Sequence, residues 1–423
     1  MLDIKLIREN PDAIKVMLEH RQINYPLEDL LSLDNDRRSL VTKAQELKEL
    51  RNKTSQEVSD IKRNGEEAIE KIERMKTISG EIEKADKEIS QIETDIESLI
   101  EKLPNIPHQS VPVGIGESSN LVLRHWGEKT YFEFDVKDHI EIGLKHGLID
   151  VERAAKLSGS RFYHLNKELV LLNHAIIALG LDLLTERHFS PVQPPYLINR
   201  KSMGGAVMLS DFEDVIYKVE GEDLYLIGTS EHPLVAMHQG EILDAKQLPL
   251  RYAGISPCFR KEAGSHGRDT KGIFRVHQFE KVEQVIMCQP RDSEALHEEM
   301  LENAESFLRL LKIPYRVVLL STGEMGKIAA KTYDIEAWLP GQEKYREIVS
   351  CSNCTDYQAR SLGIRFRDKP HEHAQLVHFL NSTLVATERT IIAIMENYQR
   401  KDGSIEVPEA LRPYLKGMET IPL

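Results

Sequence analysis

The chain has 423 residues and a mass of 48.4 kDa, which allows two or three domains with a sizeable core. Four cysteines in this length exclude a disulfide framework and suit a reducing compartment. The N-terminus has no apolar signal core, and polar residues interrupt the most apolar stretch, 169–184. We therefore expect a core helix there, no membrane span and a cytoplasmic protein. The net charge of −13 disfavours nucleic acid as a partner unless basic residues cluster.

Residues 27–103 predict a long antiparallel two-helix coiled coil, preceded by a short helical cap at 1–26. Apolar residues recur at alternating spacings of three and four, and most other positions are polar or charged. The first run contains Leu40, Ala44, Leu47, Thr54, Val58 and Ile61; the second contains Ile82, Ala85, Ile89, Ile92, Ile96, Leu99 and Leu103. Asn64-Gly65 lies between the runs and predicts the turn. Arms of roughly 35 residues reach about 50 Å, more than a globular core needs, so we expect them to project.

Charge is unevenly distributed along this hairpin. Between residues 37 and 63 the outgoing helix carries eight basic residues against four acidic ones, whereas glutamate dominates the returning helix. The basic residues are Arg37, Arg38, Lys43, Lys48, Arg51, Lys53, Lys62 and Arg63. Such a stripe fits an RNA backbone, but a dimerisation coil or a spacer accounts for it equally well. The Pro104 and Pro107 break predicts a domain boundary near residue 108, giving domains 1–108 and 109–423.

The next stretch alternates short helices and strands. Helices are expected at 139–148, 151–157 and 166–187, with a turn into a strand at 158–163. Three prolines within 189–198 predict a strand end or an edge strand. Residues 223–228 predict a strand that ends at Thr229-Ser230-Glu231, a sequence that a helix N-cap would also explain.

Residues 254–283 predict two strands joined by a long polar loop, and they carry the strongest chemical signal. Gly264, Gly267 and Gly272 favour the loop, which also carries several basic residues. Arginine forks at strand ends are suited to holding a polyphosphate. These arginines are Arg260, Arg268 and Arg275, with the carboxylates Glu262, Glu280 and Glu283 among them.

The C-terminal part predicts a helix at 292–311, strands at 315–320, 331–338 and 346–350, and a strand and turn at 376–383. A helix is expected to open at 387–390, where an arginine would suit phosphate. Cys351 and Cys354 follow the strand that is expected to end at residue 350. Because one C-x-x-C lacks two further ligands at zinc spacing, no structural zinc is predicted.

The sequence F-R-x-E, the glycine-rich basic loop and F-R-V-H-Q-F-E-K-V-E resemble motif 2 of the class II aminoacyl-tRNA synthetases, in the form typical of the seryl-tRNA synthetase family. The resemblance covers nearly the whole chain, including the L-P-N-I-P-H break, motif 1 at 189–198, T-x-E at 229–231 and motif 3 at Arg389. It implies an α+β protein. A helical tRNA-binding arm would precede a catalytic domain built on an antiparallel sheet flanked by helices.

The resemblance also implies the reaction. Serine is activated by ATP to seryl-adenylate, with release of pyrophosphate, and the seryl group is transferred to tRNA(Ser); whether tRNA(Sec) is also charged stays open. The arm and the motif 2 loop would hold the tRNA, and motif 1 would form a homodimer. A catalytically inactive, RNA-binding paralogue is the alternative, although no motif arginine is missing.

Residue roles carried over from the resemblance fall into three sets. Arg260, Glu283 and Arg389 are the catalytic candidates. Serine would be bound by Thr229, Glu231, Glu283, Asn381 and Thr383. ATP would be bound by Arg260, Lys261, Glu262, Arg275, Val276, Phe279, Glu347, Ile348, Val349, Ser350 and Arg389. Glu347 and Ser350 would hold the Mg²⁺ that accompanies ATP.

Glu388 is the one departure that bears on the site. Many members of the family have glycine before the motif 3 arginine, whereas this chain has a glutamate. A carboxylate there either weakens the hold on the γ-phosphate or points away from it.

Overall fold

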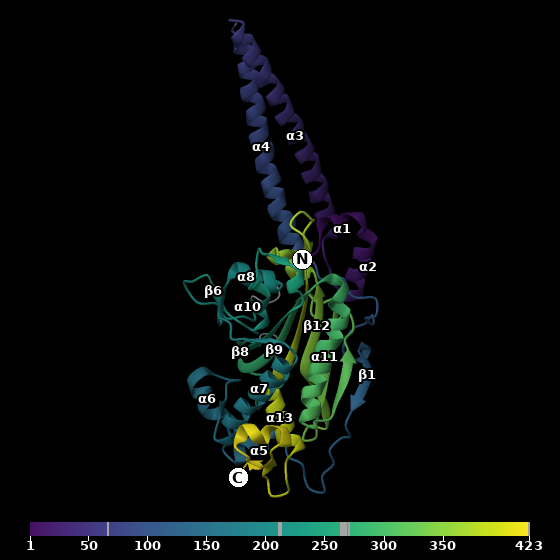
Figure 1. The fold of residues 1–423 in the computed structure, drawn as a ribbon, viewed down its shortest axis with the longest axis vertical. Helices are drawn as coiled ribbons and strands as arrows, with labels where there is room; N and C mark the ends of the chain where they lie inside the picture. The colour runs from purple at the N-terminus through teal and green to yellow at the C-terminus, as the bar shows by residue number, and fades with distance from the viewer. Residues whose placement is uncertain (66, 210–213, 263–268, 270, 422–423) are drawn as a thin grey trace. The chain divides into compact units, whose positions relative to one another are not determined.

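The computed structural model describes residues 1–65, 67–209, 214–262, 269 and 271–421. The polar loop of the predicted motif 2 hairpin, residues 263–268 and 270, therefore lies outside the described residues. The chain forms two compact units, Met1–Pro104 and Asn105–Leu423 (Figure 1). Each unit is described by itself below.

The first unit is helical and contains the expected hairpin. Its helices are α1 (Ile4–Glu9), α2 (Pro11–Arg21), α3 (Leu27–Arg63) and α4 (Ile69–Ile100). At 1.5 Å per residue, the 37 residues of α3 extend about 55 Å. Ala44, Val58, Ile82 and Ala85 are buried at the predicted positions of the 3-4 pattern. Cross-helix ion pairs, such as Lys48 with Asp86 at 2.9 Å, flank this seam, so the predicted helical pairing is confirmed.

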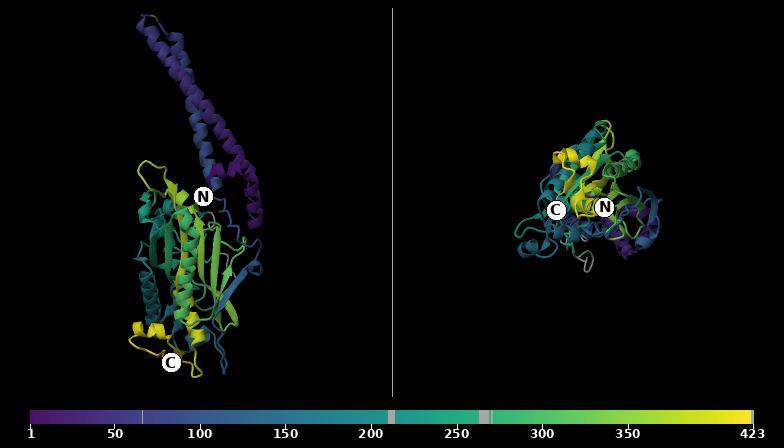
Figure 2. Two further views of the ribbon diagram at one scale, coloured as in Figure 1. Left: turned by 45° about the vertical axis from the view of Figure 1, so that its right-hand side comes forward. Right: turned by 90° about the horizontal axis from the view of Figure 1, so that it is seen from below.

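The second unit is built on an eight-stranded sheet in the order β1-β10-β11-β12-β15-β9-β8-β4 (Figure 2). Its strands are β1 (Leu121–Trp126), β4 (Ser190–Val192), β8 (Leu250–Phe259), β9 (Gln278–Cys288), β10 (Tyr315–Leu319), β11 (Lys331–Leu339), β12 (Lys344–Thr355) and β15 (His378–Ala386). All neighbours are antiparallel except β4, which pairs with β8 in parallel at the sheet edge. The predicted fold class and the edge position of the proline-rich strand are confirmed.

Helices and small strands complete this unit. The helices are α5 (His139–Lys145), α6 (Val151–Ser158), α7 (Glu168–Glu186), α8 (Arg200–Ala206), α10 (Glu231–Ala236), α11 (Ser293–Leu310), α12 (Tyr357–Leu362) and α13 (Thr387–Asn397). The small strands are β2 (Ile149–Asp150), β3 (His164–Leu165), β5 (Leu197–Asn199), β6 (Leu224–Leu226), β7 (Ile242–Asp244), β13 (Arg365–Arg367), β14 (Gln375–Leu376), β16 (Ile405–Glu406) and β17 (Thr420–Ile421).

Helices α7, α11 and α13 pack on the sheet and contribute to its main hydrophobic core. A Cβ on Gly180 of α7 would lie 3.0 Å from Val385 of β15 and 3.8 Å from Phe307 of α11, which shows how closely these elements pack. Among the described residues, α7 is also the one helix long and apolar enough to cross a membrane. Because 56% of its most apolar window is buried inside the domain, it is a core helix, as predicted.

Three predicted strand boundaries are wrong. The second strand of the motif 2 hairpin begins at Gln278, although Ile273 and Val276 were expected within it. Both residues are buried, but the chain before them bends at Gly272, which has φ +73° and packs against α5. The burial of these two side chains therefore does not mean that their backbone pairs with another strand.

The other two corrections concern strands that continue further than expected. Cys351 and Cys354 lie inside β12, not after it, and serve as small buried side chains between β11 and β15. Strand β15 runs on to Ala386 through the polar residues 381–383, which were expected to form a turn. Pairing with β9 overrides that local preference.

Candidate active site

A cavity of about 480 Å³ opens within the second unit, lined by the ends of β8 and β9, by β11, β12 and β15, and by the start of α13. Most of the predicted site residues line it. They are Glu231, Arg260, Glu262, Arg275, Val276, Phe279, Glu283, Glu347, Ile348, Ser350, Asn381, Thr383 and Arg389. The structure thus gathers residues that lie up to 158 positions apart in the sequence into one site.

Arg260 directly follows the last residue of β8. Its backbone N–H donates to the carbonyl of His277 at 2.9 Å, and its Nε donates to the carbonyl of Gly228 at 3.1 Å. The guanidinium carbon lies 5.2 Å from the centre of the Phe279 ring. These contacts hold a cation beside an aromatic face, as a bound nucleotide would need.

Arg389 and Arg275 supply the other cationic groups. Arg389 donates from NH1 to the backbone carbonyl of Glu347 and pairs with its carboxylate, each at 3.0 Å. Arg275 pairs with Glu262 at 2.8 Å. Each of these two arginines is therefore paired with a carboxylate that also lines the cavity, and the ion pair orients its guanidinium group.

The opposite end of the cavity is lined by acidic and amide groups. The buried Glu283 contacts Lys281 through an ion pair and accepts a hydrogen bond from Thr383 at 3.3 Å. Glu231 accepts from Gln358 Nε2 at 3.0 Å. Burial, followed by repulsion from Glu283, raises the pKa of Glu231 to about 7. A ligand ammonium placed here would favour the ionised carboxylate.

Three predicted residues lie outside the cavity lining. Lys261 is exposed, with its Nζ 5.8 Å from the centre of the Tyr217 ring. Val349 is buried in β12, where alternation turns it away from Ile348 and Ser350. Thr229 is buried and accepts a hydrogen bond from the N–H of Glu231 at 3.2 Å. This bond lies in the turn into α10, whose N-cap is Ser230 and has no side-chain cap hydrogen bond, so the N-cap that the sequence also allowed is not formed by a side chain.

Oxygen ligands suitable for Mg²⁺ are present on the neighbouring strands β11 and β12. Ser350 is paired with Asp334 across these strands, and its hydroxyl donates to that carboxyl. Asp334 Oδ1 is buried and has no hydrogen-bond partner among the described residues, and Glu347 lies on the same strand as Ser350. Burial and repulsion from Glu347 raise the pKa of Asp334. A hard cation would relieve both costs, so these residues fit Mg²⁺.

Within the described ranges, no group of three or more His, Cys, Asp or Glu side chains is arranged to hold a metal by itself.

Several site residues were missed in the sequence. Lys281 and Asp334 line the cavity, and His232 and Gln358 support it. Burial, with the positive charges of Arg260 and Lys281, lowers the pKa of His232 to about 3, so the neutral ring accepts from the N–H of Gly228. For Lys281, strand alternation with Phe279 and Glu283 was an available signal.

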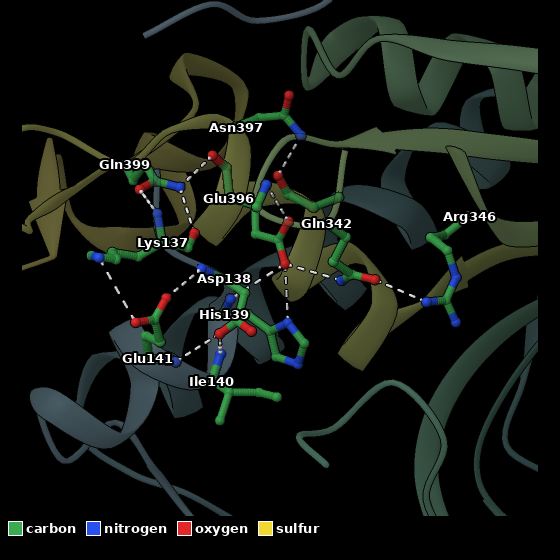
Figure 3. A network of polar contacts seen from close by, with 12 residues as sticks. Lys137, Asp138, His139, Ile140, Glu141, Gln342, Arg346, Glu396, Asn397 and Gln399 are labelled. Carbon is green, nitrogen blue, oxygen red and sulfur yellow. Dashed lines mark hydrogen bonds and ion pairs between the residues drawn. The ribbon is translucent and has the colours of Figure 1, made fainter. Parts of the chain in front are cut away.

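Arg346 was also missed, and a buried network positions it (Figure 3). The fully buried carboxylate of Glu396 accepts hydrogen bonds from His139, from the N–H of Gly341 and from Gln342 Nε2, at 3.0–3.3 Å. Gln342 Oε1 in turn accepts from Arg346 at 2.8 Å. Arg346 then pairs with Asp269 and lies over the ring of Phe274, which lines the cavity.

Glu388 is 3% exposed, and its carboxylate is engaged. It accepts from the Tyr163 hydroxyl, the Thr387 hydroxyl and the backbone N–H of Glu280. The carboxylate is directed at these donors, and Glu388 also lines the cavity beside Arg389.

The antiparallel sheet and the cavity with paired arginines define a class II aminoacyl-tRNA synthetase. Residues 215–398 match the family model of the tRNA synthetase class II core domain (G, H, P, S and T). Residues 1–107 match the seryl-tRNA synthetase N-terminal domain.

Full-length relatives specify the family. The chain is 53% identical to a serine–tRNA ligase of Nitrosopumilus maritimus over 421 residues, covering 100% of both chains. It resembles the crystal structure of seryl-tRNA synthetase from Pyrococcus horikoshii complexed with ATP, with a TM-score of 0.96, 46% identity and full coverage of both chains. It also resembles the crystal structure of the cytoplasmic serine–tRNA ligase from Naegleria fowleri in complex with AMP, with a TM-score of 0.90 and 36% identity, covering 100% of this chain and 99% of that one. The chain belongs to the seryl-tRNA synthetase family.

Proposed function

We propose that this chain activates L-serine with ATP and transfers the seryl group to tRNA(Ser). The observation that carries the proposal is that the arginines Arg260 and Arg389 line one cavity together with the carboxylate Glu283. The serine carboxylate attacks the α-phosphorus and expels pyrophosphate, so the site needs in-line positioning and charge neutralisation, with no covalent enzyme intermediate.

Each end of the cavity has its own task. Arg260 neutralises the α-phosphate, Arg389 holds the γ-phosphate with help from Arg275, and Phe279 stacks on the adenine beside Glu262 and Val276. Glu347 and Ser350, joined by Asp334, hold the Mg²⁺. Bound there, the ion neutralises charge that develops on the phosphates. The backbone of Ile348 and Val349 completes the nucleotide site, and Lys261 contacts ATP from the rim.

Serine is selected at the acidic end. Glu231, oriented by Thr229, binds the substrate ammonium, and Glu283 and Thr383 receive the hydroxyl, with Asn381 beside them. A site built to hydrogen-bond a hydroxyl rejects the analogue that lacks it by on the order of 10⁴-fold. Alanine is therefore excluded by the unpaired polar groups that it would leave behind.

The deciding experiment is amino-acid-dependent ATP–pyrophosphate exchange across the standard amino acids, with and without tRNA. Exchange that depends on serine and needs no tRNA would support the proposal. Absence of exchange with every amino acid would refute it and favour an inactive RNA-binding paralogue.

The arm and the motif 2 loop are the proposed tRNA contacts. Exposed basic residues on α3, including Arg38, Lys43 and Lys53, support the arm's role. Deletion of residues 30–103 should abolish charging of tRNA(Ser) and leave serine-dependent exchange intact. Charging of tRNA(Sec) in the same assay decides whether it is a second acceptor.

The proposed assembly is a cytoplasmic homodimer formed through motif 1 together with the helix that precedes it, α7. Two apolar side chains of α7 support it, because Val170 and Leu171 are 38% and 52% exposed. Leu171→Glu should convert a dimer to a monomer in analytical ultracentrifugation. A monomeric wild-type chain would overturn this part of the proposal.

A further inference from the structure

At the edge of the cavity, strand β9, which carries motif 2 residues, is no longer paired with β15. The ladder between β9 and β15 ends at the pair Lys281 and Ala386, because β15 there turns into α13. Glu280 lies one position beyond this end. Its opposite residue on β8 is Pro257, but the N–H and C=O of Glu280 both point away from β8, toward the side where β15 would continue. The backbone of Glu280 therefore needs hydrogen-bond partners from the side that β15 has left.

Two side chains at the start of α13 supply those partners. The N–H of Glu280 donates to both carboxylate oxygens of Glu388, at 3.2 Å each. The carbonyl of Glu280 accepts from the hydroxyl of Thr387 at 3.3 Å. The same hydroxyl lies 2.9 Å from Glu388 Oε2, so the two side chains extend the ladder by one residue.

The Glu388 carboxylate also holds a third segment, residues 161–163. The hydroxyl of Tyr163 donates to Oε1. The preceding Phe162 stacks on His277, with ring centres 5.0 Å apart and planes 17° apart. His277 is hydrogen-bonded to the backbone of Arg260. One buried carboxylate therefore ties together motif 2, motif 3 and the segment that covers the base of the hairpin.

This position lies beside two groups proposed to bind the nucleotide, Phe279 and Arg389. Phe279 and Lys281 flank Glu280 and line the cavity, and Arg389 follows Glu388 directly. We propose that Glu388 is a positioning residue that holds β9, with Phe279, in place relative to α13, with Arg389, for ATP binding. The proposal rests on the proposed function only in naming ATP as the ligand. A glutamate before the motif arginine is, on this basis, part of the scaffold of the site.

The test compares Glu388→Met with Glu388→Gln. Methionine keeps the side-chain length but cannot replace the carboxylate as acceptor for Glu280 and Tyr163. Glutamine keeps one oxygen for the Glu280 N–H, and its amide can donate to the Tyr163 oxygen. We expect Glu388→Met to raise KM for ATP in the exchange assay by about 10-fold, since buried donors lose their acceptor. Serine KM should stay within about twofold, and Glu388→Gln should restore ATP KM to within about threefold of wild type.

Glu305 provides a matched control. It is also 3% exposed and accepts from a tyrosine hydroxyl, that of Tyr315 at 3.0 Å, but it lies on α11 and does not line the cavity. Glu305→Met should lower the melting temperature without changing ATP KM. A Glu388→Met enzyme that shows only a stability loss of the same kind, or that raises both substrate KM values equally, would refute positioning.

Calorimetric measurement of Mg–ATP binding to wild type and the same variants tests the positioning role of Glu388 separately from the proposed serine activation. If wild type lacks exchange but binds Mg–ATP, the proposed activity fails while Glu388 is still tested by the loss of affinity in Glu388→Met. If wild type is active and Glu388→Met binds ATP normally, only the positioning role fails.

Discussion

Glu283→Gln should separate the two tasks of the acidic end, folding and serine binding. Glu283 and Lys281 form an ion pair with side chains 2% and 8% exposed. Removing one partner of a buried pair typically costs 3–5 kcal/mol, because the other charge stays buried. Glu231 is close enough to interact with Lys281 and offsets part of this cost. We therefore expect a loss of about 3 kcal/mol in the free energy of unfolding.

The effect on serine follows from the hydrogen bond to its hydroxyl. A hydrogen bond to a charged group contributes about 1.5–3 kcal/mol, which corresponds to a rise of roughly 10- to 150-fold in serine KM. ATP KM should stay near the wild-type value, because the phosphates contact the opposite end of the cavity. Urea denaturation and exchange kinetics with each substrate varied in turn measure the two effects independently.

The double variant Lys281→Met/Glu283→Gln is the control. It removes both charges, so stability should return toward the wild-type value while serine KM stays high. If Glu283→Gln loses stability but keeps its serine KM, Glu283 serves folding alone and its assignment to the serine hydroxyl is wrong.

Three further predictions concern pH, packing and the arm. Because the folded pKa of Glu231 is raised to about 7, the folded state retains a proton that the unfolded state releases near pH 4.5. Stability should therefore fall as pH rises from about 4.5 to 7, and serine KM should fall through pH 7 as the carboxylate ionises, with both trends weakened in Glu231→Gln. Gly254→Ala should raise serine KM, since its Cβ would lie 2.7 Å from Oγ of Ser230, between Thr229 and Glu231. Unchanged kinetics would show that this turn can move aside without affecting serine binding. Reversing the charge of Lys43 and Lys53 should weaken tRNA binding and reduce its salt dependence in filter binding, with exchange unaffected. The matched control reverses two exposed lysines of α4, Lys84 and Lys87.

The sequence predicted most where local pattern and tertiary role coincide. The 3-4 spacing of residues such as Ala44 and Ile82 is a property of each helix, so it predicted the paired arm. Asp334 and Gln358 were out of reach for the opposite reason. Each gains its role from a partner far along the chain or across a strand, Ser350 for Asp334 and Glu231 for Gln358. No spacing in either segment encodes those pairings.

The predicted strand boundaries were wrong where the burial of a side chain and the pairing of its backbone do not go together. Ile273 is as buried as a central strand residue, yet the chain around it does not pair, since Gly272 turns it over α5. Asn381 and Thr383 are polar but lie within a central strand, because their side chains line a cavity. Whether these side chains are packed in the core, as for Ile273, or line a cavity, as for Asn381 and Thr383, depends on the tertiary structure and not on the local sequence.

Strand β9 shows why the departure at Glu388 could not be interpreted from the sequence. Phe279, Lys281 and Glu283 line the cavity, whereas Gln284 bonds the carbonyl of Met300 on α11, on the other face. A slip of one residue would exchange these faces, so contacts on both sides fix the register. Glu388 meets this strand at a backbone N–H, which almost any residue at position 280 would supply. A partner of that kind leaves no trace in side-chain identity, so only the course of the chain reveals it.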